Sequence, residues 1–228
     1  MKLSVIIPIY NERATVLELI RRVQAINYPK EIILVDDYST DGTREILKEF
    51  GLSNPESIKF LYHDVNKGKG AAFRTGISAV EGEIVVVQDA DLEYDLDDYY
   101  KLLIPILDGR ADVVFGSRFV GSEEHRVLYF WHYMGNKFLT LFINMVTNLN
   151  LSDMETCYKM IRTDVLRKFT LQENRFGFDP EFTAKVAKLK CRIYEVGVSY
   201  SGRDYAQGKK ITWKDGVRVL WCILKYGL

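Results

Sequence analysis

The chain has 228 residues, of which 47% are hydrophobic and 27% are charged, and its formal net charge at pH 7 is zero. This length suits one α/β domain or two small ones, and the apolar fraction supports a full hydrophobic core rather than a disordered chain. Because the charges balance, the composition indicates no bulk attraction to nucleic acid, and we expect no nucleic-acid partner.

Cysteine spacing and apolar runs exclude several further classes of protein. Cys157, Cys191 and Cys222 are scattered and show no C-x-x-C spacing, which argues against a disulfide framework or a zinc site and fits a reducing compartment. The apolar stretch at the N-terminus is interrupted by Asn11 and Glu12, so it is too short for a signal peptide. No apolar run is long enough to predict a standard transmembrane helix.

Apolar runs alternate with segments of helical periodicity through the first half of the chain. Strands are predicted at residues 3–9, 31–35, 58–62, 84–88 and 112–115, and helices at residues 13–25, 42–50, 70–80 and 95–107. This alternation predicts an α/β fold with a parallel, doubly wound sheet. After about residue 120 the regular alternation ends, and aromatic-rich helical segments begin.

Two segments of the second half have the pattern of amphipathic helices. Residues 127–147 are mostly apolar but carry a narrow polar stripe, which includes Asn136, Thr140 and Asn144 at intervals of four residues. Such a helix is either sealed in a core or lies in a membrane surface. Residues 212–227 predict a basic helix with tryptophans. It is either a membrane-surface element or a terminal helix that docks with its basic side in water.

An acidic run follows the central predicted strand, with Asp89, Asp91 and Glu93 at alternate positions. In an extended segment alternate side chains point the same way, so all three carboxylates could meet one hard cation, or Asp91 and Glu93 could do so without Asp89. Carboxylate oxygens suit Mg²⁺ or Mn²⁺, and ligand sites in open α/β sheets lie beyond the carboxyl ends of the strands. The alternative is an acidic loop that is simply solvated.

Several motifs in chain order resemble the signatures of family 2 glycosyltransferases with the GT-A fold. They are VIIPIYNE at 5–12, VDDYSTDGT at 35–43, NKGKG at 66–70 and QDAD at 88–91. Further motifs in the second half are similar to the dolichyl-phosphate mannose synthase-like branch. They are GSR at 116–118, DMETCYK at 153–159 and GRDYAQGKKI at 202–211. One departure is Glu93, because the mannose synthases carry Gln there.

The resemblance implies an inverting, metal-dependent enzyme that transfers mannose or glucose from a nucleotide sugar, GDP-mannose or UDP-glucose, to a polyprenyl or dolichyl phosphate. It implies a single GT-A domain over residues 1–228, with the nucleotide-sugar-binding part at 1–120 and the acceptor-binding part at 121–228. The two amphipathic segments would then be interfacial helices, and the protein would lie peripherally on the cytoplasmic side of a membrane.

The resemblance also implies roles for single residues at the donor site. Asp91 and Glu93 would ligate Mg²⁺ or Mn²⁺, and Asp89 would be a third ligand or would hold ribose or sugar hydroxyls. A divalent metal would stabilise the charge of the leaving diphosphate. Asp37 has a simpler alternative as a turn residue. The expected nucleotide-sugar-binding residues are Pro8, Tyr10, Glu12, Asp37, Lys69, Asp89 and Lys209.

A lipid monophosphate is largely dianionic at neutral pH, so it needs cations to bind and aim it rather than a strong general base. Arg118, Arg126 and Arg203 are expected to hold this phosphate, unless they are ordinary surface cations. Lys209 or Lys210 is expected to close over the donor diphosphate. The expected catalytic residues are Asp91, Arg118 and Lys210.

Two other functions compete with lipid glycosylation. A glycosyltransferase that extends a glycan hydroxyl would need a general base, for which Asp153 is the candidate, although Asp153 could instead cap a turn. A non-catalytic peripheral membrane protein could use the two amphipathic helices beside an inactive sugar-nucleotide fold. Asp179 and Glu181 are interpreted mainly as the start of a helix, and a role in the active site is the second interpretation. The histidines form no cluster.

Overall fold

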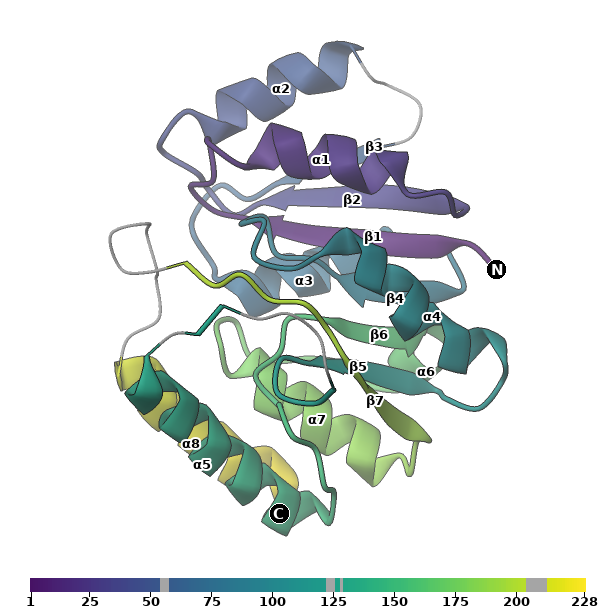
Figure 1. Ribbon diagram of the computed structural model, residues 1–228. Coiled ribbons are helices and arrows are strands. Elements are labelled where there is room, and N and C mark those ends of the chain that lie inside the picture. Colours follow the sequence, from purple (N-terminus) through teal and green to yellow (C-terminus); the bar gives the residue numbers. More distant parts are fainter. Residues whose placement is uncertain (54–57, 122–125, 128, 204–212) are drawn as a thin grey trace.

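The computed structural model describes residues 1–53, 58–121, 126–127, 129–203 and 213–228 (Figure 1). These residues form a 7-stranded sheet with the strand order β3-β2-β1-β4-β6-β5-β7. The strands are β1 (Leu3–Ile9), β2 (Lys30–Asp36), β3 (Ile58–Tyr62), β4 (Ile84–Val87), β5 (Val113–Ser117), β6 (Lys159–Arg162) and β7 (Ile193–Gly197).

The sheet is mostly parallel, as the alternation of strands and helices predicts. β1 pairs in parallel with β2 and β4, β2 with β3, and β5 with β7. β6 is the exception, because it runs antiparallel between β4 and β5. Strands β6 and β7 have no counterpart among the predicted strands. β6 has only four residues, KMIR, and polar side chains at both ends, so no apolar run marks it.

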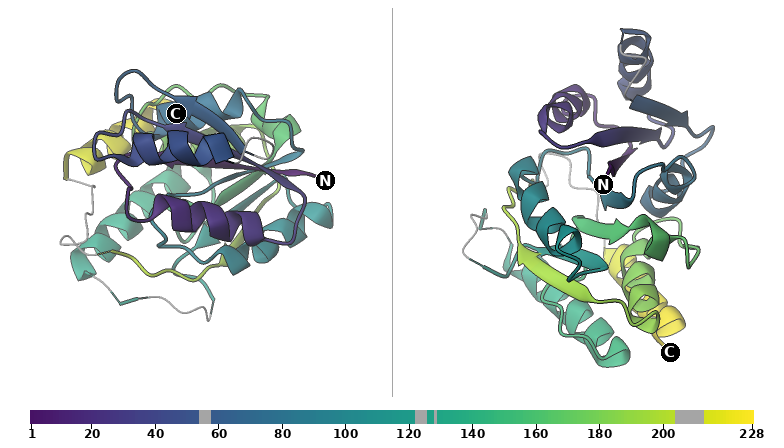
Figure 2. Two further views of the ribbon diagram at one scale, coloured as in Figure 1. Left: turned by 90° about the horizontal axis from the view of Figure 1, so that it is seen from above. Right: turned by 90° about the vertical axis from the view of Figure 1, so that its right-hand side faces the viewer.

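Helices cover both faces of the sheet, with α1 and α3 on opposite faces (Figure 2). The face of α1 that packs inward follows the helical period, since its buried residues are Val16, Leu19, Ile20 and Val23. The helices are α1 (Val16–Ala25), α2 (Thr43–Ser53), α3 (Lys69–Ile77), α4 (Tyr99–Leu107) with the short helix η1 (Leu96–Asp98) before it, α5 (Phe130–Thr147), α6 (Thr163–Leu166), α7 (Phe178–Lys188) and α8 (Trp213–Gly227).

The two predicted amphipathic helices are α5 and α8, which lie side by side next to α7 (Figure 1). A second, smaller core joins these three helices and is formed by Ile143, Met154, Ala184, Val219, Cys222, Ile223 and Tyr226. None of the described helices combines the length and hydropathy that a membrane span requires.

Helix α5 packs with its polar stripe inward. Asn136 Nδ2 donates to Asp153 Oδ1 at 3.1 Å, and Thr140 Oγ1 accepts from the backbone nitrogen of Met154 at 3.1 Å. Asn144 binds both backbone polar atoms of Leu151, at 2.7 and 3.0 Å. The stripe therefore holds the loop before β6, and most of the apolar side chains of α5 are left facing outward.

Helix α8 docks on the domain with its basic side partly in water, as one of the two predictions for it states, since the side chains of Arg218 and Lys225 are 54% and 37% exposed. Arg218 Nη2 and Lys225 Nζ both lie against Glu173, at 2.7 and 3.2 Å. The buried face is formed by Val219, Cys222, Ile223 and Tyr226. Trp221 remains 46% exposed, since its ring lies under the guanidinium of Arg218 rather than in the core.

Candidate active site

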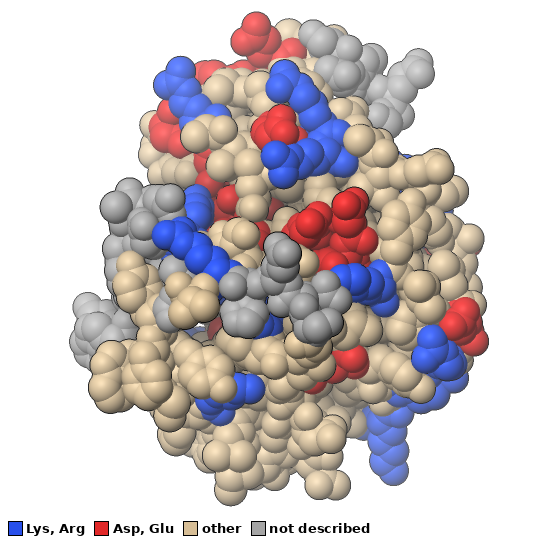
Figure 3. All heavy atoms as spheres, viewed as in Figure 1, with Lys and Arg blue, Asp and Glu red and all other residues tan. Residues whose placement is uncertain are grey.

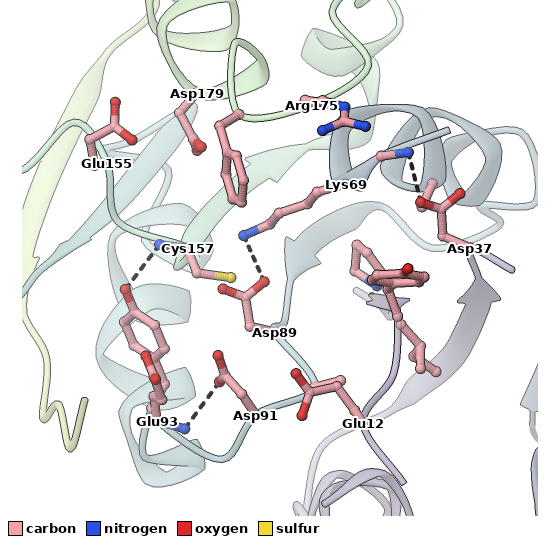
Figure 4. Close-up of a pocket in the computed structure, with 18 of the residues that line it drawn as sticks. Glu12, Asp37, Lys69, Asp89, Asp91, Glu93, Glu155, Cys157, Arg175 and Asp179 are labelled. Carbon is pink, nitrogen blue, oxygen red and sulfur yellow. Dashed lines mark hydrogen bonds and ion pairs between the residues drawn. The ribbon is translucent and has the colours of Figure 1, made fainter. Parts of the chain in front are cut away.

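A pocket of ≈ 450 Å³ opens beyond the carboxyl ends of β1, β2 and β4 (Figure 4). Ligand sites in open α/β sheets lie at this edge because the loops that follow parallel strands meet there. Segments from both halves of the sequence line the pocket. They include the loop before α3, the turn before β6, the start of α7 and the chain after β7. The charged lining residues are Glu12, Asp37, Lys69, Asp89, Asp91, Glu93, Arg118, Glu155, Arg175, Asp179 and Arg203.

Asp37 forms one end of the pocket, where Pro8 and Tyr10 also lie. Its Oδ1 accepts the backbone N–H of Lys67 at 2.8 Å and its Oδ2 that of Gly68 at 2.7 Å. Asp37 therefore shapes the loop before α3, which contains the NKGKG motif, as well as lining the pocket. Gly68 fits this loop because its φ is 97° and a Cβ there would lie 2.4 Å from the carbonyl oxygen of Asn174.

His63 supports Asp37 from behind, a role that no sequence motif indicates. Its Nδ1 lies 2.7 Å from Asp37 Oδ1, and its Nε2 lies 2.9 Å from Thr75 Oγ1 on α3. The imidazole is buried, with 5% of its surface exposed. His63 thus connects the end of β2 to α3 and fixes the direction in which the carboxylate of Asp37 points.

Asp89 and Lys69 form an ion pair in the middle of the pocket, with Lys69 Nζ 2.6 Å from Asp89 Oδ1 (Figure 4). Burial would lower the pKa of Lys69, but the charge of Asp89 outweighs it and keeps that pKa well above its usual value. Burial would likewise raise the pKa of Asp89, and the charge of Lys69 instead holds it low. Both groups are therefore charged at neutral pH.

Asp91 and Glu93 do not lie in the extended segment that the alternation of their positions predicts. The residue between them, Leu92, has a left-handed backbone with a φ of 61°, so the chain turns after Asp91. The turn is closed by a hydrogen bond from the backbone nitrogen of Glu93 to Asp91 Oδ1 at 3.2 Å. The extended geometry was wrong because a tight turn follows β4 directly.

Arg203, from the chain after β7, lies among these carboxylates. Its guanidinium contacts Glu12 at 3.1 and 3.2 Å, Asp91 Oδ2 at 3.2 Å and Glu93 Oε1 at 3.2 Å. The backbone nitrogen of Arg203 also donates to Glu93 Oε1 at 2.9 Å. Arg203 therefore neutralises the acidic cluster, which is a different environment from the acceptor-phosphate site predicted for it.

In the described part of the chain, no three acidic, histidine or cysteine side chains converge as a ready metal site. The donor set still suits a divalent cation. Burial and the charges of Asp89 and Glu93 raise the pKa of Asp91 to about 7. Crowded carboxylates of this kind are the oxygen ligands that Mg²⁺ and Mn²⁺ prefer. A bound cation would reduce the repulsion between these carboxylates, which the guanidinium of Arg203 reduces in this structure.

Arg118 leaves β5 and pairs with Asp153, which has no exposed surface. Arg118 Nε and Nη2 bind the two carboxylate oxygens of Asp153 at 2.7 and 2.8 Å. Burial would raise the pKa of Asp153, but the charge of Arg118 outweighs it and lowers that pKa. The turn-capping prediction for Asp153 is therefore wrong, since its carboxylate serves the buried guanidinium.

The other cations predicted to bind phosphate are Arg126, Lys209 and Lys210, and the structure does not place any of them in the pocket lining of the described residues. Arg126 lies outside the pocket lining, and its Nη1 donates to the carbonyl oxygen of Gly202 at 3.1 Å, next to Arg203. Lys209 and Lys210 lie outside the described residues. Asp179 lies in the first turn of α7, as the helix-start pattern predicts. It also lines the pocket and pairs with buried Lys159 at 2.5 Å.

The chain matches the family described as Glycosyl transferase family 2 over residues 4–170. The chain belongs to glycosyl transferase family 2. Membership in this family of sugar-transferring enzymes confirms the resemblance carried by the motifs at the ends of β1, β2 and β4. The motifs GSR at 116–118 and DMETCYK at 153–159 lie inside the matched region, and only GRDYAQGKKI at 202–211 lies past it.

Relatives of this family 2 member include proteins named for lipid-phosphate glycosylation. A dodecaprenyl-phosphate galacturonate synthase from Rhizobium johnstonii is 26% identical over 213 residues, which are 92% of this chain and 62% of that protein. A dolichol-phosphate mannosyltransferase from Pyrococcus furiosus is 40% identical over 135 residues, which are 57% of this chain and 37% of that protein. The chain thus spans less than two thirds of either relative.

The fold is shared with a solved enzyme. The structure of glucosyl-3-phosphoglycerate synthase from Mycobacterium tuberculosis in complex with Mn²⁺, UDP and glucosyl-3-phosphoglycerate superposes with a TM-score of 0.75 at 18% sequence identity. The superposition covers 99% of this chain and 79% of that one. At this identity the likeness concerns the fold, and it confirms the predicted GT-A architecture.

Proposed function

We propose that this family 2 member transfers a hexose, mannose or glucose, from a nucleotide sugar, GDP-mannose or UDP-glucose, to a polyprenyl or dolichyl phosphate at a membrane surface. The observation that carries the proposal is the pocket at the ends of β1, β2 and β4, where carboxylates and cations from both halves of the chain meet. The names of the relatives from Rhizobium johnstonii and Pyrococcus furiosus support a polyprenyl-phosphate acceptor.

The donor would bind across the pocket. Asp37, Pro8 and Tyr10 line the end that we assign to the nucleoside, and Lys69 lies beside the acidic residues that follow β4. Asp89, Asp91 and Glu93 would hold Mg²⁺ or Mn²⁺, which supplies positive charge for the leaving diphosphate. Arg203 would then exchange its carboxylate partners for ligand phosphate oxygens, since guanidinium groups bind both.

The acceptor phosphate would attack the anomeric carbon directly. A phosphate oxygen forms the new bond to that carbon while the bond to the diphosphate oxygen breaks, and the diphosphate leaves with the electron pair, which inverts the configuration. The phosphate is already anionic, so no strong base is needed. Asp153 is a poor candidate for a base because Arg118 occupies both of its oxygens and lowers its pKa. This favours the phosphate acceptor over a glycan hydroxyl.

The outer side of α5 supports a membrane surface as the site of reaction. Trp131, Phe138, Leu141 and Met145 are 81%, 58%, 59% and 72% exposed, and their spacing places them on one side of the helix. The surface in this region is largely free of charged side chains (Figure 3). Exposed apolar patches of this kind mark membrane or protein contacts. A lipid-linked acceptor makes the membrane the natural partner, and we place the protein peripherally on its cytoplasmic side.

A transfer assay with defined substrates tests the proposal. The protein is incubated with radiolabelled GDP-mannose or UDP-glucose, Mn²⁺ or Mg²⁺, and a polyprenyl phosphate in detergent micelles. The expected result is a labelled product that partitions into organic solvent and is lost with a chelator present. Transfer to water-soluble glycans alone would favour the hydroxyl acceptor, and failure to bind any nucleotide sugar would favour the non-catalytic alternative.

A further inference from the structure

Glu155 is an acidic residue of the pocket that lies within the motif DMETCYK and forms no ion pair among the described residues. It belongs to the turn before β6 and lines the pocket together with Cys157 and Asp179. Its Oε1 is buried and has no hydrogen-bond partner among the described residues. Buried polar atoms are nearly always hydrogen-bonded, so a bound ligand is the natural partner for this oxygen.

The neighbours of Glu155 leave its carboxyl group without a matching cation. The charge of the buried Lys159 acts on Glu155, but its Nζ is bound to Asp179 Oδ1 at 2.5 Å and to the carbonyl oxygen of Thr156. Arg118 is bound in turn to Asp153. Burial and the charge of Asp179 raise the pKa of Glu155 to about 8, although Lys159 and Arg118 oppose this. At neutral pH its carboxyl group can therefore both donate and accept hydrogen bonds.

The place of Glu155 in the pocket identifies which part of a donor it would meet. Glu155 and Asp179 lie at one end of the pocket, Asp37 lies on the opposite side, and Asp89 with Lys69 lies between them (Figure 4). If the nucleoside binds at Asp37 and the diphosphate at the acidic residues after β4, the sugar extends towards Glu155.

We propose that Glu155 hydrogen-bonds a hydroxyl group of the donor sugar. The proposal rests on the proposed function. A sugar hydroxyl both donates and accepts hydrogen bonds, so it can satisfy the buried Oε1 of Glu155, which has no partner among the described residues.

Binding measurements on Glu155→Ala and Glu155→Gln test this proposal. The titrants are UDP-glucose, GDP-mannose, UDP and GDP, each with Mn²⁺. Loss of a hydrogen bond to a buried carboxyl group is expected to weaken binding of the preferred nucleotide sugar about tenfold to a hundredfold in Glu155→Ala, with UDP and GDP unchanged. In Glu155→Gln, the loss is expected to be smaller than in Glu155→Ala, because the amide keeps a donor and an acceptor at the same place.

A matched control separates sugar recognition from folding. Glu31 is also a buried acidic residue, but it lies at the start of β2, at the other end of the strand from the pocket, where it pairs with Lys59. Glu31→Gln is expected to lower thermal stability without changing any of the four affinities. Equal losses for nucleotide sugar and free nucleotide in both Glu155 variants, or no loss in either, would overturn the inference and leave the proposed function intact. Absence of nucleotide-sugar binding by the wild-type protein would overturn both.

Discussion

Most of the charged side chains of the pocket are arranged in groups that neutralise each other. Lys69 pairs with Asp89, and Arg118 pairs with Asp153. Arg203 serves three carboxylates at once, among them that of Glu12, which lies 191 positions away in the sequence. A charged ligand that enters the pocket must therefore compete with existing partners, so substitutions here affect binding and local stability in separable ways.

Asp91→Asn tests the acidic cluster. The substitution removes one negative charge from the group that would hold a divalent cation while keeping the size of the side chain. We expect the rate of sugar transfer to fall about a hundredfold or more, because charge stabilisation of the leaving group is lost. Thermal stability is expected to change little, since the crowding that raises the pKa of Asp91 is relieved. Asp164→Asn, at an exposed ion pair with Arg162, is the control.

Asp153→Ala tests the partner of Arg118. The substitution leaves a buried guanidinium without its carboxylate, which typically costs about 3–5 kcal/mol of unfolding free energy. Denaturant unfolding measures this loss, and Arg118→Leu combined with Asp153→Leu is expected to recover part of it. If Asp153→Asn abolished turnover at unchanged stability and acceptor affinity, Asp153 would be a general base and the hydroxyl acceptor would be favoured.

Glu155 links pH to stability. Its pKa is raised to about 8 by burial first and by Asp179 second, whereas an unfolded glutamate titrates near ~4.3. Between these values the folded state binds more protons than the unfolded state, so this group makes stability fall as pH rises. Glu155→Gln removes the titration. Its melting temperature relative to wild type is expected to rise between pH 5 and pH 8, and a constant difference would contradict the pKa shift.

Among the helices, α5 has the least usual orientation. Its polar residues are used internally, where Asn136, Thr140 and Asn144 bind the loop 151–154 through side-chain hydrogen bonds. Because those groups face the protein, the apolar side faces outward. α8 repeats this arrangement in part, since Arg218 and Lys225 reach Glu173 while Val217 and Leu224 stay exposed. The two helices therefore present apolar surface next to each other.

Charge on the outer face of α5 is expected to weaken membrane binding. Trp131→Glu and Met145→Glu place a carboxylate on this face, and the fraction of protein that floats with phosphatidylcholine–phosphatidylglycerol vesicles is expected to fall about tenfold. Because both side chains are mostly exposed, unfolding free energies are expected to stay within about 0.5 kcal/mol of wild type. Leu52→Glu on α2, where Leu52 is 87% exposed, is the matched control. Equal flotation of all these variants would remove α5 from the membrane contact.

Across the full chain, the pocket depends on contacts between its two halves. Residues after β1, β2 and β4 supply most of its acidic groups, whereas Arg118, Glu155, Asp179 and Arg203 come from β5 onward or from just after it. The antiparallel β6 is inserted between β4 and β5, which brings the turn of Glu155 beside the end of β4. The division into a donor part at 1–120 and an acceptor part at 121–228 remains a prediction, since both parts contribute to this one pocket.

Local sequence was enough for the features that depend on neighbours along the chain. The first five strands follow from apolar runs, α1 follows from its helical period, and the acidic residues after β4 follow from an ordered set of motifs. Those patterns are local because backbone geometry sets which side chains of one element share a face. The family could therefore be recognised before any fold was seen.

Only the folded chain decided the features that depend on distant partners. A turn at Leu92 lies between Asp91 and Glu93, His63 lies behind Asp37, and Oε1 of Glu155 is buried without a hydrogen-bond partner among the described residues. The apolar face of α5 points outward because the polar stripe on the other side of the helix binds the loop 151–154. Burial and charge pairing are properties of three-dimensional neighbours, and no periodicity along a strand or helix specifies which residues those neighbours will be.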